Sequence, residues 1–318
     1  MIRKIYLLFI CLLATNFCAV YAQHNSFKVI PLGVKGGLDE SNLSSYMIAP
    51  LGSDNYICAD AGTIRHGIDV AISNHLFTKS PEEVLKNNIK GYLISHAHLD
   101  HVAGMIINAP DDSPKNIYAL PSVVEVLRDK YFTGKAWANF ANEGEVPRLG
   151  KYTYVYLKDQ EKKELTGTEM EVVPFSLSHG APYESTAFLI GHQDAYILYL
   201  GDTGADRIEK SDKLRRLWEQ MAPLIRKGQL KAIFIETSFP DQQPEGKLFG
   251  HLTPHLLMEE MGELNQLAGI ASLRKVNIVI THTKGFGQQQ LDLMKELEKD
   301  NVLQLKLVSP VQGKIMMF

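Results

Sequence analysis

Four side chains that can bind a metal ion lie within six residues, in the string His96-Ala-His-Leu-Asp-His101. The chain has eleven histidines in 318 residues, so such a string arises by chance in on the order of one chain in a thousand. An apolar segment, Gly91–Ser95, comes directly before it, and a turn after this strand can bring the four groups to one point. Imidazoles with a carboxylate suit zinc, manganese or iron, whereas calcium needs more oxygen ligands.

Three more segments repeat this arrangement of an apolar strand followed at once by a possible ligand. They are Glu171–Leu177 before His179, Ala195–Leu200 before Asp202, and Val276–Thr281 before His282. One histidine after a strand is usually an ordinary polar residue, but three such residues and the first string together make seven possible ligands. The sequence therefore predicts a metal centre built at the ends of several strands.

In this order the ligand types resemble the metallo-β-lactamase superfamily. The resemblance implies one metal on His96, His98 and His179, a second on Asp100, His101 and His282, and Asp202 bridging the two. It implies two divalent metal ions, with zinc expected and manganese, iron or cobalt as alternatives. β-Lactamases of this fold usually carry a cysteine at the position of Asp202. The aspartate at this position disfavours β-lactam hydrolysis. Aspartates at both 100 and 202 resemble the pattern of the phosphodiesterase and general hydrolase branches.

Further stretches resemble one branch, the class II 3′,5′-cyclic-nucleotide phosphodiesterases. They are the glycine-rich Leu32–Tyr46, the continuation His101–Pro110, and Phe234–Pro240 followed by Gly250–Leu256. The resemblance spans about Leu32 to His282; Ala109, where the family usually has serine, is a departure remote from the ligands. It implies hydrolysis of cyclic AMP or cyclic GMP to the 5′-nucleotide.

The same resemblance supplies candidates for the chemistry beyond metal binding. Asp100 is one of these catalytic candidates, because it is also an expected metal ligand. Our hypothesis is that His251 protonates the leaving ribose oxygen and that Glu236 positions the ring of His251. Asn42 and His255 are expected substrate contacts, the alternatives being a turn residue and a helix-surface residue. The glycines after the first strand could serve a tight turn or let a phosphate approach.

The elements that must position these residues are strands separated by amphipathic helices. Strands are expected at Phe27–Pro31, Tyr46–Leu51, Gly91–Ser95, Tyr152–Leu157, Glu171–Leu177, Ala187–Gly191, Ala195–Leu200, Lys231–Glu236, Val276–Thr281 and Val302–Val308. Helices are expected at Pro81–Asn87, Val102–Ile107, Pro121–Tyr131, Ser211–Ile225, Pro254–Leu267 and Gln288–Asp300, the last with Leu291, Met294 and Leu297 on one face. The motifs favour an α/β fold, a four-layer αββα sandwich of the metallo-β-lactamase type.

Residues 1–22 read as a secretory signal, with Arg3 and Lys4, a ten-residue apolar run, and small residues up to Ala22. We therefore expect a phosphodiesterase domain over residues 23–318 that is periplasmic or secreted, without a stable membrane anchor. Of the three cysteines only Cys58 lies beyond this segment, so an internal disulfide is excluded in that product. The 33 Lys and Arg, less the two in the segment, leave 31 against 36 Asp and Glu.

Several rival functions remain open at this point. A tRNA 3′-processing endonuclease shares the metal ligands but needs a basic arm to hold RNA. This acidic chain has no Lys- and Arg-rich insertion of that kind. The expected partner is therefore a small cyclic nucleotide and not a nucleic acid. Another secreted hydrolase of this fold could act on a lactone, thioester or sulfate ester. A metal-binding protein without catalysis is a further alternative. The aromatic stretch Tyr131–Phe140 could cover a nucleobase or belong to the core.

Overall fold

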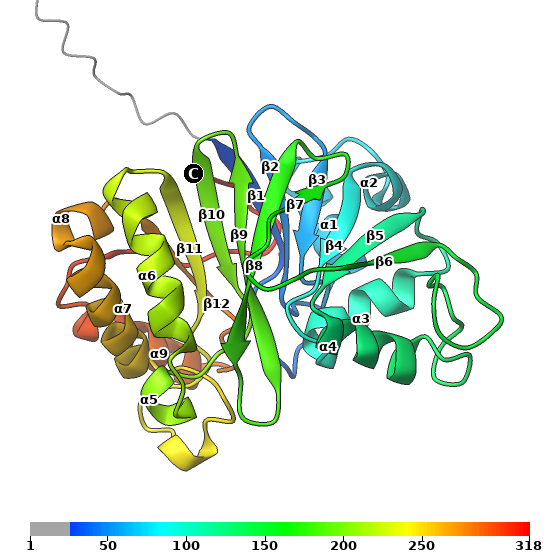
Figure 1. Cartoon of the computed structure of the whole chain (residues 1–318). Helices are drawn as coiled ribbons and strands as arrows, with labels where there is room; N and C mark the ends of the chain where they lie inside the picture. Colours follow the sequence, from blue (N-terminus) through cyan, green and yellow to red (C-terminus); the bar gives the residue numbers. More distant parts are fainter. Residues whose placement is uncertain (1–25) are drawn as a thin grey trace, which may run out of the picture.

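The computed structural model of the protein describes residues 26–318, and the signal segment expected over residues 1–22 lies outside this part of the chain. The described part contains two seven-stranded sheets (Figure 1). In the first, the order is β14 (Met316–Met317), β1 (Phe27–Gly33), β2 (Ser45–Pro50), β3 (Tyr56–Ala59), β4 (Ile89–Leu93), β5 (Lys115–Ala119) and β6 (Tyr152–Tyr156). In the second, it is β13 (Lys306–Val308), β12 (Asn277–Thr281), β11 (Leu230–Glu236), β10 (Ala195–Leu200), β9 (Glu184–His192), β8 (Met170–Ser178) and β7 (Lys163–Leu165).

Helices cover the outer face of each sheet, so the chain forms four layers (Figure 1). Beside the first sheet lie α1 (Arg65–Ser73), α2 (Pro81–Asn87), α3 (Leu99–Asn108) and α4 (Pro121–Val126), and beside the second lie α6 (Lys213–Arg226), α7 (Pro254–Ala268), α8 (Ile270–Leu273) and α9 (Gln288–Asp300). Side chains alternate between cores along a strand: Ile48 of β2 packs between the sheets, while Met47 packs against the helices. The expected αββα sandwich is confirmed.

Local signals explain why several elements begin where the sequence predicts. The Ser80 hydroxyl accepts a hydrogen bond from the Glu83 N–H, and the Glu83 carboxylate accepts one from the Ser80 N–H, which caps α2. Thr253 caps α7 in front of Pro254. The buried face of α9 differs from the prediction, because Leu293 and Leu297 are buried whereas Leu291 is exposed.

A buried charge at the start of β5 explains why this strand escaped prediction. Lys115 donates to the carboxylate of Asp112, which also accepts from the hydroxyls of Tyr92 and Tyr152 at 2.6 and 2.9 Å. We expect Asp112→Asn to lower the free energy of unfolding by about 3–5 kcal/mol, because it leaves the ammonium group buried without its counter-charge. Chemical denaturation measures this loss.

The control for this substitution is Asp54→Asn, which removes the partner of Lys28 at the surface. An exposed pair contributes about 0–1 kcal/mol, so the control should unfold almost as the unaltered protein does. Losses of similar size in the two variants would contradict a stabilising role for the buried network.

Other features bear on the expected chemistry. Cys58 is buried in β3, and burial raises the pKa of its thiol to about 12, so it stays protonated at neutral pH. Of the aromatic stretch, Phe132 and Phe140 belong to the core under the first sheet, whereas Tyr131 is only partly buried. Within residues 26–318, none of the helices has the length and apolar character needed to cross a bilayer.

Candidate metal centre

The candidate ligands follow the carboxyl ends of strands from both sheets, and these ends meet at one edge of the sandwich. The string His96–His101 follows β4, His179 follows β8, Asp202 follows β10, and His282 follows β12. β10, β11 and β12 are parallel, so their carboxyl ends share an edge. The structure therefore brings together all seven residues that the sequence proposes as ligands, although they span nearly two hundred residues of chain.

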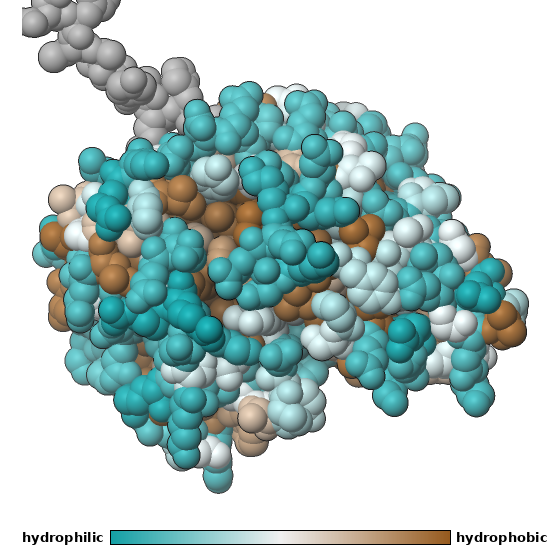
Figure 2. Space-filling view, viewed as in Figure 1, coloured by the Kyte–Doolittle hydropathy of each residue, from teal (hydrophilic) through white to brown (hydrophobic). Residues whose placement is uncertain are grey.

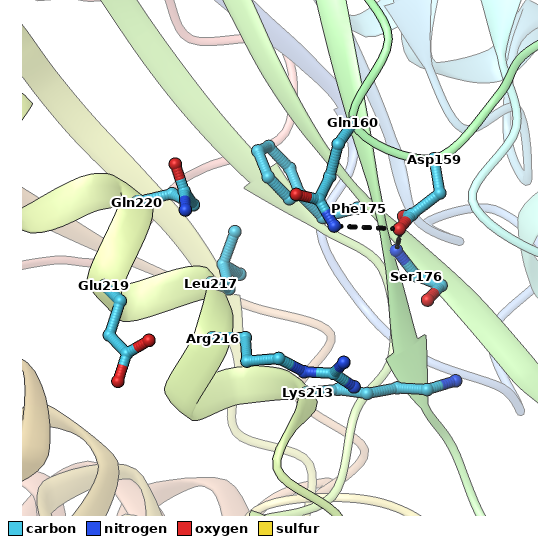
Figure 3. A pocket seen from close by; sticks show the side chains of 9 residues that line it. All are labelled: Asp159, Gln160, Phe175, Ser176, Lys213, Arg216, Leu217, Glu219 and Gln220. Atoms are coloured by element: carbon cyan, nitrogen blue, oxygen red, sulfur yellow. Dashed lines mark hydrogen bonds between the residues drawn. The ribbon is translucent and has the colours of Figure 1, made fainter.

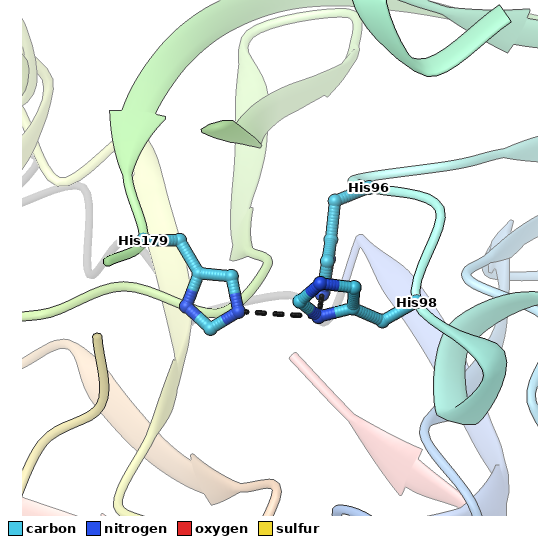
Figure 4. A group of neighbouring side chains, drawn as sticks. All are labelled: His96, His98 and His179. Atoms are coloured by element: carbon cyan, nitrogen blue, oxygen red, sulfur yellow. Dashed lines mark hydrogen bonds between the residues drawn. The ribbon is translucent and has the colours of Figure 1, made fainter. Parts of the chain in front are cut away.

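Three histidines form the first group (Figure 4). The Nε2 atom of His96 lies 3.1 Å from Nδ1 of His98, and Nε2 of His179 lies 3.4 Å from the same atom. Ligand atoms arranged tetrahedrally around zinc are roughly 3.4 Å apart. The three nitrogens are therefore spaced as ligands of one ion would be.

Asp202 lies between this group and a second one made by Asp100, His101 and His282. Its carboxylate oxygens are 3.3 Å from Nε2 of His101 and 3.2 Å from Nε2 of His282. The oxygen that faces His282 is also 3.7 Å from Nε2 of His96. Asp100 completes the second group, with a carboxylate oxygen 3.2 Å from Nε2 of His282. This position allows the Asp202 carboxylate to bind two ions at once.

The outer ring nitrogens of the histidines show which nitrogen faces the centre. Nδ1 of His101 lies 2.8 Å from the Asp60 carboxylate, and Nδ1 of His179 lies 2.9 Å from the carbonyl oxygen of Gly250. Both partners can only accept, so each Nδ1 carries a proton, and in the neutral ring Nε2 presents its lone pair inward. Burial, with a smaller contribution from His179, lowers the pKa of His98 to about 4, which keeps that ring neutral as well.

The inward-facing lone pairs repel one another, and a bound cation would offset this repulsion. Nε2 of His101 is buried and lacks a hydrogen-bond partner among the described residues. Nitrogen lone pairs and carboxylate oxygens that face one another across 3.1–3.8 Å repel unless a positive charge lies between them. Imidazole and carboxylate donors are the ligands that zinc and related divalent ions prefer, so the residues fit two such ions.

Asp60, which is not among the residues proposed from the sequence, holds the second group in place. Its carboxylate accepts from Nδ1 of His101 at 2.8 Å, from the Tyr199 hydroxyl at 2.7 Å, and from the N–H and hydroxyl of Ser95. The Ser95 hydroxyl lies 3.1 Å from Nδ1 of His96. One signal could have revealed Asp60, because a lone carboxylate directly follows the apolar strand Tyr56–Ala59.

The glycines after β1 let the backbone of the β1–β2 loop lie against the ligands. Gly37 has a φ of +53°, and its N–H donates to the Asp100 carboxylate at 2.8 Å. A Cβ atom at Gly36 would lie 2.1 Å from the ring of His282. Of the two interpretations in the sequence, the geometry favours a turn, and this turn packs on the metal ligands.

Glu236 and His251 form a buried pair beside the second group. Nδ1 of His251 donates to Glu236 at 2.8 Å, and the Ser238 hydroxyl donates to the same carboxylate at 2.5 Å. Burial disfavours the charged imidazole, but the Glu236 carboxylate outweighs this and raises the pKa of His251. On the other side of the ring, Nζ of Lys284 lies 2.8 Å from Nε2. The sequence did not single out Lys284, although it stands two residues after His282.

The two expected substrate contacts lie outside this cluster. The Asn42 side-chain oxygen accepts from the N–H of Val34 at 3.0 Å and thus holds the β1–β2 loop. His255 lies on the surface of α7, and its Nε2 faces Glu259 at 3.3 Å. The geometry agrees with the alternatives given in the sequence, a turn residue and a helix-surface residue.

A depression between β8 and α6 contains charged side chains but no group of candidate ligands (Figure 3). Lys213 pairs with Glu184 at 3.0 Å, and Arg216 pairs with Asp212 at 2.9 Å. These charges already have partners. Among the described residues, groups of three or more possible metal ligands occur only at the centre described above.

Comparisons with known proteins agree with this geometry. The sequence profile of the class II cAMP phosphodiesterases matches residues 73–305. A 3′,5′-cyclic-nucleotide phosphodiesterase of Aliivibrio fischeri is 39% identical over 331 aligned positions, which cover 99% of each chain. The structure of unliganded yeast PDE1 superposes with a TM-score of 0.82 at 23% identity and covers 93% of this chain and 100% of its own.

The fold is also seen in a metallo-β-lactamase fold protein, YhfI of Bacillus subtilis, with a TM-score of 0.62 at 17% identity over 93% of this chain and 100% of that one. The family profile matches most of the chain, and the phosphodiesterase of Aliivibrio fischeri is 39% identical along almost the whole length. Together these two matches establish the family. The chain belongs to the class II cAMP phosphodiesterases, a family of hydrolases with the metallo-β-lactamase fold.

Proposed function

We propose that the protein hydrolyses 3′,5′-cyclic AMP and cyclic GMP to the 5′-nucleotides with two divalent metal ions, zinc in the first instance. The observation that carries the proposal is the Asp202 carboxylate lying between two groups of ligands, in a chain of this family. His96, His98 and His179 would hold one ion, Asp100, His101 and His282 the other, and Asp202 would bind both. Two such ions supply a water of lowered pKa and stabilise negative charge on the phosphoryl group.

The residues of the chain supply what the metals do not. Ring opening expels the ribose 3′-oxygen, which is a poor leaving group until it is protonated. His251 would donate this proton from Nε2, while Glu236 accepts the N–H at Nδ1 and fixes the orientation of the ring. The Lys284 ammonium group lies 2.8 Å from Nε2 and can only donate, so it would supply the proton that Nε2 passes to the leaving oxygen.

The test is a panel of substrates given to the metal-loaded protein, with products separated by chromatography. We expect 5′-AMP from 3′,5′-cyclic AMP and 5′-GMP from cyclic GMP, with much slower turnover of linear phosphodiesters. Faster hydrolysis of a lactone, thioester, sulfate ester or β-lactam would overturn the proposal in favour of another hydrolase of this fold. Bound metal without activity on any of these compounds would support a binding protein.

We also propose that the protein is exported and that cleavage after Ala22 leaves Gln23 as its first residue. The basic start, the short apolar run and the small residues before the cleavage point support this proposal. The mass of the intact protein, purified from a periplasmic extract or the culture medium, checks it. A mass that includes residues 1–22 would contradict it.

Asp60→Asn is expected to weaken metal binding roughly 10- to 100-fold, because His101 loses the carboxylate that orients its ring. Competition with a chelator of known affinity measures the change. Asp54→Asn, at an exposed residue two positions before β3, is the control and should bind metal as the unaltered protein does. Unchanged affinity in Asp60→Asn would show that Ser95 and the strand alone position the ligands.

A further inference from the structure

A cavity of about 290 Å³ opens beside the first group of ligands. Its walls come from the ligand loop, from α4 with the turn that follows, and from the tip of the β8–β9 hairpin, and they include His96, His98, Val123, Val126, Tyr131 and Tyr183. The space-filling view shows the surface indented at its lower edge, between this hairpin and α4 (Figure 2). The volume is near the lower end of small-ligand sites, which suits part of a nucleotide.

Two tyrosines face this cavity in different ways. The Tyr131 hydroxyl donates to the carbonyl oxygen of Ala97 at 3.0 Å, so this ring is fixed against the ligand loop. Tyr183 is 59% exposed, and its ring lies 5.2 Å from the ring of His98 at an angle of 70°. An exposed aromatic ring packed against a metal ligand offers a flat apolar surface at the entrance to the chemistry.

We propose that this cavity receives the nucleobase and that Tyr183 stacks on it. This inference rests on the proposed function, which places the cyclic phosphate at the ligands. The base of a cyclic nucleotide projects from the end of a rigid fused ring opposite the phosphate, so it must lie in a space next to the metal centre. Here that space is bounded by Val123, Val126 and the two tyrosines. Stacking on an aromatic face tolerates adenine and guanine alike, so the cavity can serve both cyclic nucleotides.

A rival position for the base lies on the other side of the centre. Phe286 is 46% exposed there, four residues after His282, and Nζ of Lys35 lies 4.5 Å from the centre of its ring. Lys35 already covers part of this ring. The cavity beside His98 does not include Phe286 in its lining.

The experiment compares the binding of 5′-AMP and ribose 5-phosphate to the metal-loaded protein by titration calorimetry. The two compounds share the phosphate and the sugar, so their affinity ratio reports the base alone. We expect Tyr183→Ala to lower this ratio roughly 10- to 100-fold and to leave ribose 5-phosphate binding unchanged. Tyr183→Phe should retain the ratio, because the flat ring remains. Tyr156→Ala, an exposed tyrosine on β6, is the matched control.

The outcomes separate this inference from the proposed function. An unchanged ratio in Tyr183→Ala, or an equal loss for both compounds, would overturn the assignment of the cavity. A fall of the ratio in Phe286→Ala instead would place the base on the other side and would also overturn it. If Tyr183→Ala lowers the ratio while the unaltered protein fails to hydrolyse cyclic AMP, the cavity assignment stands and the proposed reaction fails.

Discussion

Replacing Asp202 with alanine is expected to remove bound metal and to lower kcat on cyclic AMP by roughly a thousandfold or more. One oxygen of this carboxylate lies 3.2 Å from Nε2 of His282 and 3.7 Å from Nε2 of His96, so its loss affects both groups of ligands. Without the negative charge that both groups of ligands share, two cations bound at them would repel each other. Elemental analysis of the purified variant gives the metal content per chain.

Asp194→Ala is the matched control, because Asp194 is exposed directly before β10 whereas Asp202 follows the other end of the same strand. The control should keep both metals and full activity. Asp100→Asn should weaken mainly the second group, since Asp100 contacts His282 and not the first group of histidines. Two metals per chain in Asp202→Ala would refute the bridging role.

The ligands could be proposed from the sequence because each one is marked by local pattern. The string His96–His101 carries four possible ligands within six residues, and His179, Asp202 and His282 each follow an apolar strand. Strand ends of a sandwich meet at its edges, so residue type and position after a strand are enough to nominate these residues. The four-layer arrangement was predicted from the same motifs, and the structure has the two expected sheets with helices outside them.

The position of Asp60 after an apolar strand could have nominated that residue, but the contacts that orient the ligands could not be proposed in this way. Asp60 reaches His101 across 41 residues, and Ser238 reaches His282 across 44. Each is a single common residue without a repeating pattern, and its partner is set only when separate strands pack. The buried Lys115 misleads for the related reason that its charge is compensated in space by Asp112 and two tyrosines, not in the local sequence.

His251→Ala is expected to keep both metals and to lower kcat on cyclic AMP about 10²- to 10⁴-fold, the usual contribution of a general acid. The leaving ribose oxygen needs a proton, and His251 is the buried histidine beside the ligands whose Nδ1 is held by the Glu236 carboxylate at 2.8 Å. A nitrophenolate anion is a good leaving group, so it departs from its ester without being protonated. The same variant should therefore lose much less activity on bis(4-nitrophenyl) phosphate.

The comparison of the two substrates distinguishes proton transfer from other roles of this side chain. A structural role, or a contact with a phosphate oxygen, would lower both activities equally, and that result would reject the acid. Glu236→Gln should show the same dependence on the leaving group with a smaller loss, because the ring keeps a hydrogen-bond acceptor but loses the negative charge beside it. His66→Ala, an exposed histidine on α1, is the control and should hydrolyse both substrates at the unaltered rates. A loss confined to cyclic AMP in the His251 variant, with metal content unchanged, would support proton transfer through this histidine, whose Nε2 lies 2.8 Å from the ammonium group of Lys284.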